Sequence, residues 1–358
     1  MPEPHHPLRL AVALDTPQVP PRYDAAHHTA LARLAERGTL DFVTLGDRFG
    51  GPGPDALAVL ARIAPATERI GLVPTVTTTH TEPFHVSTAV ATLDWVSRGR
   101  AGWTVEVSTT EAEAALVGRR PAAPAAEVWP EADEVADVAG RLWDSWEDDA
   151  EIRDLATGRF VDRDKLHHVD FTGRAFSVRG PSIVPRPPQG RPVTVVEVTG
   201  DTGEPDDGGP LGLGGAEKVA AARREVAAAR ADVALVRAED PQTAGAARAE
   251  LHARALAHGR DPGRLLVLAS LPVELHSPAD AAGLADLLGD WFAQGAADGF
   301  HLRPADPDRD LTRLVEGTVP LLRERGLLRR SYEGTTLRAH LGLPRPASIY
   351  ARAREASR

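Results

Sequence analysis

The sequence predicts a single (β/α)8 barrel covering residues 1–358. Eight short segments are nearly continuous in apolar character, which is typical of strands buried on both faces. Segments with helical spacing of apolar residues lie between them, and this alternation favours parallel strands joined by helices. An open doubly wound sheet is the alternative, but the turn after the first segment, "LDTPQVPPRYD", lacks the GxGxxG pattern that usually opens such a sheet.

The expected elements follow one another in strand–helix order. The eight predicted strands cover residues 8–15, 40–47, 69–79, 101–108, 192–199, 231–237, 265–273 and 299–305. Apolar residues recurring at i, i+3 and i+4 predict helices over residues 23–38, 54–68, 132–146, 216–230, 280–295 and 310–326. The first of these helices is expected to stop at Gly38, because glycine commonly ends a helix.

Three segments depart from this alternation. Residues 148–191 are polar and contain several prolines, which predicts an excursion packed on the barrel between the fourth and fifth strands. Residues 200–215 are rich in Gly and Asp, so we expect a flexible loop there. Residues 327–358 form a C-terminal extension, for which we expect a docking role rather than a catalytic one.

Composition excludes several classes of function. The formal net charge is −10 without a long basic run, which argues against nucleic acid or an anionic membrane as a partner. The chain has no cysteine, so disulfides, thiolate metal sites and a cysteine nucleophile are excluded. We see neither a signal peptide nor an apolar run long enough to span a bilayer, and we therefore expect a cytoplasmic protein.

Polar residues gather where the predicted strands end, which is where barrel enzymes carry their functional groups. This set consists of Asp47, Thr77, Thr78, Thr79, His80, Ser108, Thr199 and His301. It contains no HxH or HExxH spacing, so we do not expect a metal site. Two members have open interpretations: Asp47 either meets a ligand or caps the turn after its strand, and His301 faces either the core or the mouth of the barrel.

Four long stretches carry a more specific pattern. They read "RIGLVPTVTTTHTEPFH", "ATLDWVSRGRAGWTVEVS", "KLHHVDFTGRAFSVRGPSIVPRPPQGRPV" and "RERGLLRRSYEGTTLRAHLGLPRP". In collinear order from about Leu8 to Pro346, the chain resembles the bacterial-luciferase-like flavin monooxygenases, in the branch of the nitrilotriacetate and dibenzothiophene-sulfone monooxygenases. The resemblance implies a barrel that binds reduced FMN from a separate flavin reductase and oxidises a small organic substrate with oxygen. It also implies a homodimer.

The same resemblance implies which residues touch the cofactor. The cofactor-binding positions would be Asp47, Thr77, Thr78, Thr104, Ser108 and Thr199. The threonine run would line the isoalloxazine ring with backbone and hydroxyl groups. Barrels of this type also tend to have a non-proline cis peptide bond at such a place. No catalytic residue is identified.

This chain departs from the family pattern at the expected ligand positions. Thr104 replaces an Asn, the loop after the fourth strand carries Ala115 and Leu116 in place of an Arg-Asn pair, and the next helix opens with Ala125, Val128 and Trp129 instead of His, Arg and Tyr. Since charge-assisted hydrogen bonds are worth roughly 1.5–3 kcal/mol each, three such losses would weaken phosphate binding a thousandfold or more. Arg119, Arg120 and Lys218 either compensate for these losses or form a solvated face.

A second departure concerns the substrate pocket. The family carries a helical insertion after the seventh strand, whereas "LPVELHSPADAAGLADLLGDWF" joins that strand directly to the next helix. Two hypotheses follow. The chain is a two-component flavin monooxygenase with altered binding groups, or it is a non-catalytic barrel that has lost FMN binding and acts as a partner subunit or binding protein.

Overall fold

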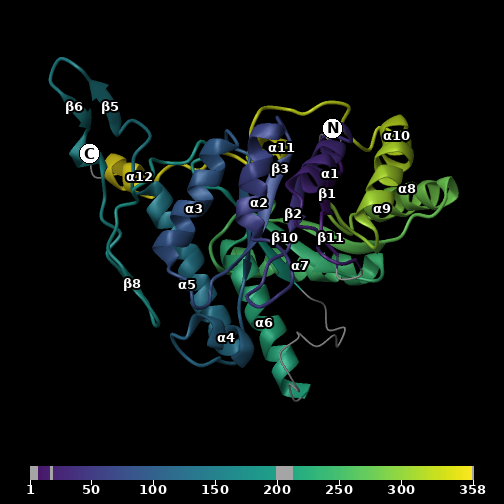
Figure 1. The fold of residues 1–358 in the computed structure, drawn as a ribbon, viewed down its shortest axis with the longest axis horizontal. Coiled ribbons are helices and arrows are strands. Elements are labelled where there is room, and N and C mark those ends of the chain that lie inside the picture. Colours follow the sequence, from purple (N-terminus) through teal and green to yellow (C-terminus); the bar gives the residue numbers. More distant parts are fainter. Residues whose placement is uncertain (1–6, 17–18, 199–212, 357–358) are drawn as a thin grey trace.

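The computed structural model describes residues 7–16, 19–198 and 213–356, and it contains a closed barrel of eight parallel strands (Figure 1). The strands are β1 (Arg9–Ala13), β2 (Phe42–Leu45), β3 (Gly71–Thr77), β4 (Gly102–Glu106), β9 (Val193–Val198), β10 (Val233–Arg237), β11 (Leu266–Val273) and β12 (Gly299–Pro304). They pair in the order β1-β12-β11-β10-β9-β4-β3-β2. The predicted fold and all eight predicted strands are confirmed.

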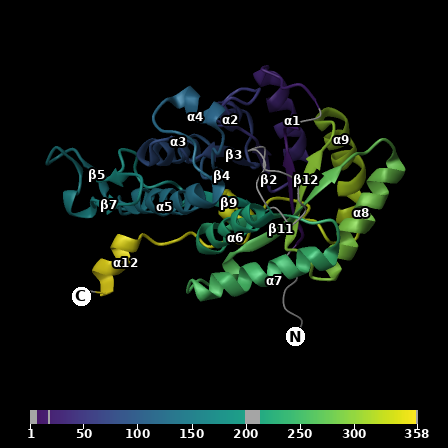
Figure 2. The ribbon, with the colours of Figure 1, turned by 90° about the horizontal axis from the view of Figure 1, so that it is seen from below.

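Helices surround the strands on every side (Figures 1 and 2). They are α1 (Ala25–Arg37), α2 (Ala56–Ile63), α3 (Pro83–Val96), α4 (Glu111–Val117), α5 (Ala125–Asp144), α6 (Leu213–Arg230), α7 (Pro241–Ala257), α8 (Pro278–Ala293), α9 (Pro307–Arg313) and α10 (Val319–Glu324), followed by the short α11 (Leu337–His340) and α12 (Ile349–Ala356). In Figure 1, α3 and α5 flank one side of the barrel and α8 and α10 the other.

Many of the barrel helices begin at a side-chain oxygen placed by the sequence. Asp240, Ser277 and Asp306 each accept a hydrogen bond from a backbone N–H in the first turn of the helix that follows. Each is followed directly by a proline at the first helical position, where its missing N–H costs nothing and its fixed φ suits the helix. These caps set where the loops at the carboxyl ends of the strands stop.

The amino end of the barrel is closed by the C-terminal segment. Leu337, Leu341 and Leu343 join the apolar side chains that fill the barrel interior. Buried ion pairs fix the segment around them: Arg329 Nη1 lies 2.8 Å from Asp41 Oδ1, and Arg338 contacts Asp232 at 2.6 Å. In Figure 1, α11 accordingly lies at the opposite end of the barrel from α4. The opening of the barrel is therefore at its carboxyl end.

The excursion expected over residues 148–191 is confirmed. It contains two small hairpins, β5 (Glu151–Asp154) with β6 (Arg159–Val161), and β7 (Phe171–Thr172) with β8 (Ser177–Val178). Both lie beyond α5, on the side where α12 ends the chain (Figures 1 and 2). The fully buried carboxylate of Asp144, at the end of α5, accepts hydrogen bonds from Arg186 and Arg191 and so anchors the returning chain.

The structure corrects the expectation of a loop after the fourth strand. Residues Glu111–Val117 form α4, because Thr110 and Glu113 make a capping box and Gly118, with a φ of +69°, ends the helix. The predicted direct connection after the seventh strand is confirmed, since only residues 274–277 join β11 to α8.

The expected non-proline cis peptide bond is not found. In the part of the chain that the structure describes, Gly180–Pro181 is the cis bond, and the bonds of residues 77–79 are trans. The trans geometry lets Thr78 N–H continue the strand ladder by donating to Glu106 O at 2.8 Å. No helix among the described residues is long and apolar enough to cross a membrane.

Candidate functional site

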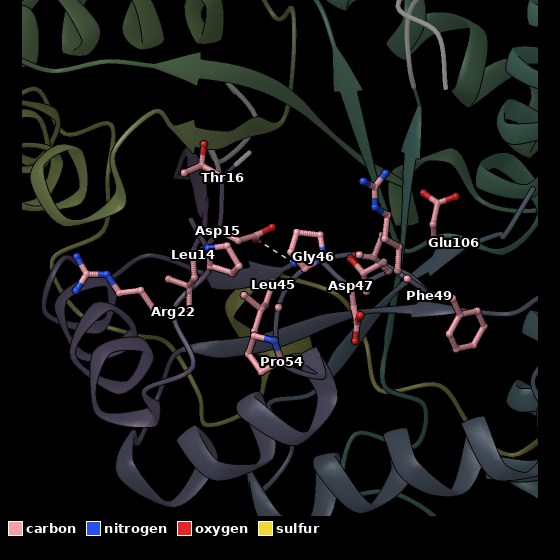
Figure 3. Close-up of a pocket in the computed structure, with 18 of the residues that line it drawn as sticks. Leu14, Asp15, Thr16, Arg22, Leu45, Gly46, Asp47, Phe49, Pro54 and Glu106 are labelled. Atoms are coloured by element: carbon pink, nitrogen blue, oxygen red, sulfur yellow. Dashed lines mark hydrogen bonds between the residues drawn. The ribbon is translucent and has the colours of Figure 1, made fainter. Parts of the chain in front are cut away.

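A cavity of about 1110 Å³ opens at the carboxyl end of the barrel. Residues 14–16, 45–54 and 104–116 supply most of its lining, with single residues from β3 and β9. Figure 3 shows this region, with Asp15, Asp47 and Glu106 around the opening. The cavity lies at the end of the barrel where functional groups were expected.

Two threonine hydroxyl groups face the cavity from neighbouring strands. Thr75 on β3 and Thr104 on β4 are partners in the strand register, and both line the cavity. Alternate residues of a barrel strand point inward, so the register places these two side chains side by side. A hydroxyl group both donates and accepts a hydrogen bond, which suits the polar edge of an otherwise flat ligand. Thr104, one of the cofactor-binding positions implied by the family resemblance, therefore lines the cavity.

Asp15 follows β1 and is packed against the end of β2. Its Oδ1 accepts a hydrogen bond from Gly46 N at 2.9 Å, drawn as a dashed line in Figure 3. A Cβ at position 46 would lie 2.6 Å from Asp15 Oδ2, so a larger residue there would displace the Asp15 carboxylate. Partial burial in the cavity raises the pKa of the Asp15 carboxyl group above its usual value.

Asp47 lies at the cavity and also holds the loop that follows its strand. It lines the cavity, and its Oδ2 also accepts a hydrogen bond from Ala56 N, the first residue of α2, at 2.9 Å. Burial raises the pKa of this carboxyl group as well. Asp47 therefore fixes the 46–55 loop that forms one wall, while its carboxyl group remains at the cavity surface.

Three carboxylates of the cavity pair with arginines. Glu106 at the end of β4 lies 3.6 Å from an Arg223 nitrogen, and Glu197 on β9 lies 3.6 Å from an Arg237 nitrogen. At the rim, Asp308 contacts Arg22 at 3.3 Å. Each pair satisfies much of the charge of its arginine within the protein, which leaves less of it for an anionic ligand.

The ends of β3 and β4 are tied together beside the cavity. Thr78 Oγ1 donates to Glu106 O at 2.9 Å, and Thr79 Oγ1 accepts from Ser108 N at 3.1 Å. Thr78 and Ser108 are buried and do not line the cavity, so the structure gives them a bracing role between the two strands. The Ser108 hydroxyl group has no hydrogen-bond partner among the described residues.

Two further members of the expected set, Thr77 and His80, are not brought to the cavity. Thr77 is buried at the end of β3 and is absent from the lining. His80 is buried with a φ of +65°, and burial lowers the pKa of its imidazole. Thr199 and the predicted loop over residues 200–215 lie outside the described residues, apart from the start of α6.

His301 faces the barrel interior. Its Nε2 shares a hydrogen bond with Thr44 Oγ1 at 2.9 Å, and its Nδ1 shares one with Ser270 Oγ at 3.0 Å. Complete burial, together with the nearby charges of Arg303 and Arg237, lowers the pKa of His301 to about 3. The imidazole is therefore neutral at physiological pH and ties three strands together beneath the cavity.

The positions expected to bind phosphate belong to other parts of the structure. Ala125, Val128 and Trp129 at the start of α5 are buried in the apolar layer between strands and helices. Leu116, on α4, lines the cavity but is 67% exposed, whereas Ala115 does not line it. These residues offer a phosphate group no side-chain donor except the indole N–H of Trp129, which is fully buried.

The candidate compensating cations are already engaged or distant. Arg119 Nη1 contacts Glu82 at 2.9 Å, and Arg120 Nη2 contacts Glu131 at 2.6 Å. Lys218 is exposed, and none of the three cations lines the cavity. Within the described residues, no group of three or more His, Asp and Glu side chains is arranged to hold a metal ion.

The comparisons with known proteins decide the family. The model of the luciferase-like monooxygenases matches residues 6–320. The chain belongs to the luciferase-like monooxygenase family. It is 30% identical to N-acetyl-S-(2-succino)cysteine monooxygenase of Bacillus subtilis (strain 168), with 90% of each chain covered, and 30% identical to nitrilotriacetate monooxygenase component A of Aminobacter aminovorans, with 92% of each covered. Dibenzothiophene-sulfone monooxygenase of Rhodococcus erythropolis is also 30% identical, over 89% of this chain and 90% of the relative.

A solved relative supports the fold of this luciferase-like barrel. EDTA monooxygenase from Chelativorans sp. BNC1 superposes with a TM-score of 0.79 at 22% identity, covering 95% of this chain and 99% of that one. The alignment with the Bacillus relative extends over 404 positions, more than the 358 residues of this chain. That relative therefore carries segments that this chain lacks, consistent with the short connection after β11.

The described residues suit the ring of a flavin but not its phosphate group. The cavity is as large as typical cofactor sites, and its apolar residues, among them Leu14, Leu45 and Val107, together with the hydroxyl groups of Thr75 and Thr104 suit a flat ring with polar edges. A phosphate group carries nearly two negative charges and needs cations or several donors. The expected phosphate positions do not provide them.

Sequence reasoning missed the acidic part of this site. Asp15, Glu106 and Glu197 all line the cavity, yet none was singled out as a candidate. A signal was available, because each lies within the last three residues of a predicted strand at an inward-facing position. Reading strand ends by alternation, rather than by likeness to a family pattern, would have found all three.

Proposed function

We propose that this chain is the oxygenase component of a two-component flavin monooxygenase, which receives reduced flavin from a separate reductase and oxidises a small organic substrate. The cavity at the carboxyl end of the barrel carries this proposal, because it combines adequate volume with an apolar and hydroxyl-bearing lining. Membership of the luciferase-like monooxygenase family supports the reaction class. The printed name of one relative, component A, supports a division of labour between separate proteins.

In this proposal the chain's own residues bind and orient the ligands. The hydroxyl groups of Thr75 and Thr104 hold the polar edge of the ring, and Leu14, Leu45 and Val107 keep water from its faces. Flavin, when bound, supplies the electrons for the reaction with oxygen. The 274–277 connection is too short to cover the cavity, so the substrate meets an opening without a cover on that side.

Anaerobic calorimetry with reduced flavin tests the proposal. We expect the purified chain to bind reduced flavin with a Kd in the micromolar range. Ala112→Trp should weaken binding at least tenfold, because Ala112 is an exposed residue of α4 that lines the cavity. Ala115→Trp is the matched control, since Ala115 is exposed on the same helix and does not line the cavity. Absence of binding for every reduced flavin up to millimolar concentration would overturn the proposal.

A second candidate function is a non-catalytic partner subunit. The burial of Val128 and Trp129 and the pairing of Arg119 and Arg120 with carboxylates favour it, because an oxygenase that depends on the FMN phosphate needs donors there. In that case the chain binds no flavin and raises the turnover of a second luciferase-like chain from the same source. Steady-state assays of that chain, with and without this one, distinguish the two functions.

We also propose that the protein forms a homodimer, as the resemblance implies, and that it works in the cytoplasm, as expected from its sequence. Trp95 and Val96 at the end of α3 are 45% and 49% exposed, which is unusual for large apolar side chains and supports an interface there. Sedimentation velocity should show a dimer for the native chain and a monomer for Trp95→Glu. A native monomer at micromolar concentration would contradict this part of the proposal.

A further inference from the structure

The cavity offers different groups to the ring of a flavin and to its phosphate. This difference predicts which flavin binds more tightly. A ring meets hydroxyl and apolar groups, as described above. A terminal phosphate would meet the charged side chains around the mouth, so electrostatics decides whether the phosphate adds to affinity. This preference rests on the proposed function, because the ligand is taken to be a flavin.

The charges lining the cavity are mostly negative. Six carboxylates line it, namely Asp15, Asp47, Glu106, Glu113, Glu197 and Asp308, against two arginines, Arg22 and Arg48. Arg223 and Arg237, outside the lining, pair with Glu106 and Glu197, which leaves four lining carboxylates against the two lining arginines. Arg22 already pairs with Asp308, and Arg48 is exposed to solvent. A dianionic phosphate placed in this mouth would lose part of its hydration and gain little compensation.

The start of α5 does not offset this deficit. Its first turn carries Glu127, whose carboxylate already complements the positive end of the helix dipole. Ala125 and Trp129 beside it are packed in the apolar layer, and Val128 is buried as well.

We propose that this site binds the flavin ring and its sugar-alcohol chain without recognising the phosphate, so that riboflavin binds at least as tightly as FMN. A site that held the phosphate by even one charge-assisted bond would favour FMN about tenfold or more. Here the ratio of the two dissociation constants, FMN over riboflavin, is expected to be one or greater. The repulsion of the phosphate is also expected to weaken as salt rises.

The test compares reduced FMN with reduced riboflavin on the full chain by anaerobic calorimetry, at low and at physiological salt. A Kd ratio of one or more, falling toward one as salt rises, supports the inference. FMN binding tenfold tighter overturns it and leaves the proposed function standing. Failure of both flavins to bind up to millimolar concentration overturns the proposed function, and the inference with it.

Two variants sharpen the comparison. Asp47→Asn removes one negative charge and keeps an oxygen for Ala56 N, so FMN should gain roughly two- to fivefold in affinity and riboflavin should not change. Arg48→Gln removes a positive charge from the same lining, so FMN should lose roughly two- to fivefold in affinity and riboflavin should not change. A loss of FMN affinity of tenfold or more in Arg48→Gln, with riboflavin unaffected, would show that Arg48 holds the phosphate and would overturn the inference.

Discussion

The two ends of this barrel are built differently. At the amino end, Leu341 and its neighbours fill the interior, and the Arg329–Asp41 ion pair is almost completely buried. At the carboxyl end, the inward-facing positions of Thr75 and Thr104 border an open cavity rimmed by carboxylates. One end thus carries most of the packing, and the other carries the groups that a ligand can reach.

This difference predicts which substitutions should change stability and which should change ligand affinity. Residues of the closed end contribute to the free energy of unfolding and do not approach the cavity, so their loss should leave ligand affinity unchanged in the folded fraction. Exposed residues of the open end, such as Leu116, make few packing contacts, so their loss should change affinity more than stability. The following predictions test this division, beginning with the largest effect.

Removing one partner of the buried ion pair at the closed end should have the largest effect. Arg329→Met leaves Asp41 without its cation, and burial already raises the pKa of that carboxyl group. We expect the free energy of unfolding in urea to fall by about 3–5 kcal/mol. The double variant Arg329→Met/Asp41→Asn should recover part of this loss. Additive losses in the double variant would show that the pair does not act as a unit.

Truncating a leucine at each end compares packing directly. Leu341→Ala, at a fully buried position of the closed end, should lower the free energy of unfolding by about 2–5 kcal/mol. Leu116→Ala, at a 67% exposed position of the cavity lining, should change it by less than about 0.5 kcal/mol. Urea unfolding measures both. Equal losses would mean that the mouth is as tightly packed as the base.

His301 lies between the two ends, and its titration should be visible in stability. Its pKa in the fold is about 3, below the ordinary value of 6.5, so below pH 6.5 the unfolded chain binds a proton that the fold excludes. Stability is therefore lost as pH falls from 6.5 toward 3, by up to about 1.4 kcal/mol per pH unit from this group.

Replacing the imidazole isolates this contribution. His301→Gln keeps groups that can bond to Thr44 and Ser270, and its stability should fall less steeply between pH 6 and pH 4. His340, whose pKa burial also lowers to about 3, remains in both proteins and cancels in the comparison. Parallel pH profiles of stability for the two proteins would show that His301 is protonated in the fold.

The fold could be predicted from the sequence because its signals are local and repeated. Each strand is a short apolar run, and residues such as Ser277 and Asp306 mark where helices begin. The α4 helix was not predicted, although Thr110 and Glu113 form a capping box. Its apolar residues lie on an exposed helix, so the sequence pattern is similar to that of a loop. The capping box alone did not predict a helix there, because the segment has no apolar face that packs against the core.

The site could be predicted only in part, because which side chains share a cavity depends on register and on loops. Thr104 and Asp47 line the cavity, whereas Thr78 and Ser108 brace two strand ends beside it. The pairing of Arg119 with Glu82 joins residues far apart in the chain, and no local pattern shows it. The residue types near a strand end therefore predict which side chains lie near the mouth of the barrel. They do not predict the hydrogen-bond or ion-pair partners of those side chains.

The smallest effect should come from a single hydroxyl group, and it tests the boundary of the cavity. Thr104→Val removes the hydroxyl group with little change in volume, so affinity for reduced flavin should fall roughly two- to tenfold, as expected for one hydrogen bond. Thr77→Val, on the neighbouring strand and outside the lining, should leave affinity unchanged. Anaerobic calorimetry measures both. If Thr77→Val weakens binding as much as Thr104→Val, the ligand reaches beyond the cavity to the threonine run, and the position implied by the family resemblance holds instead.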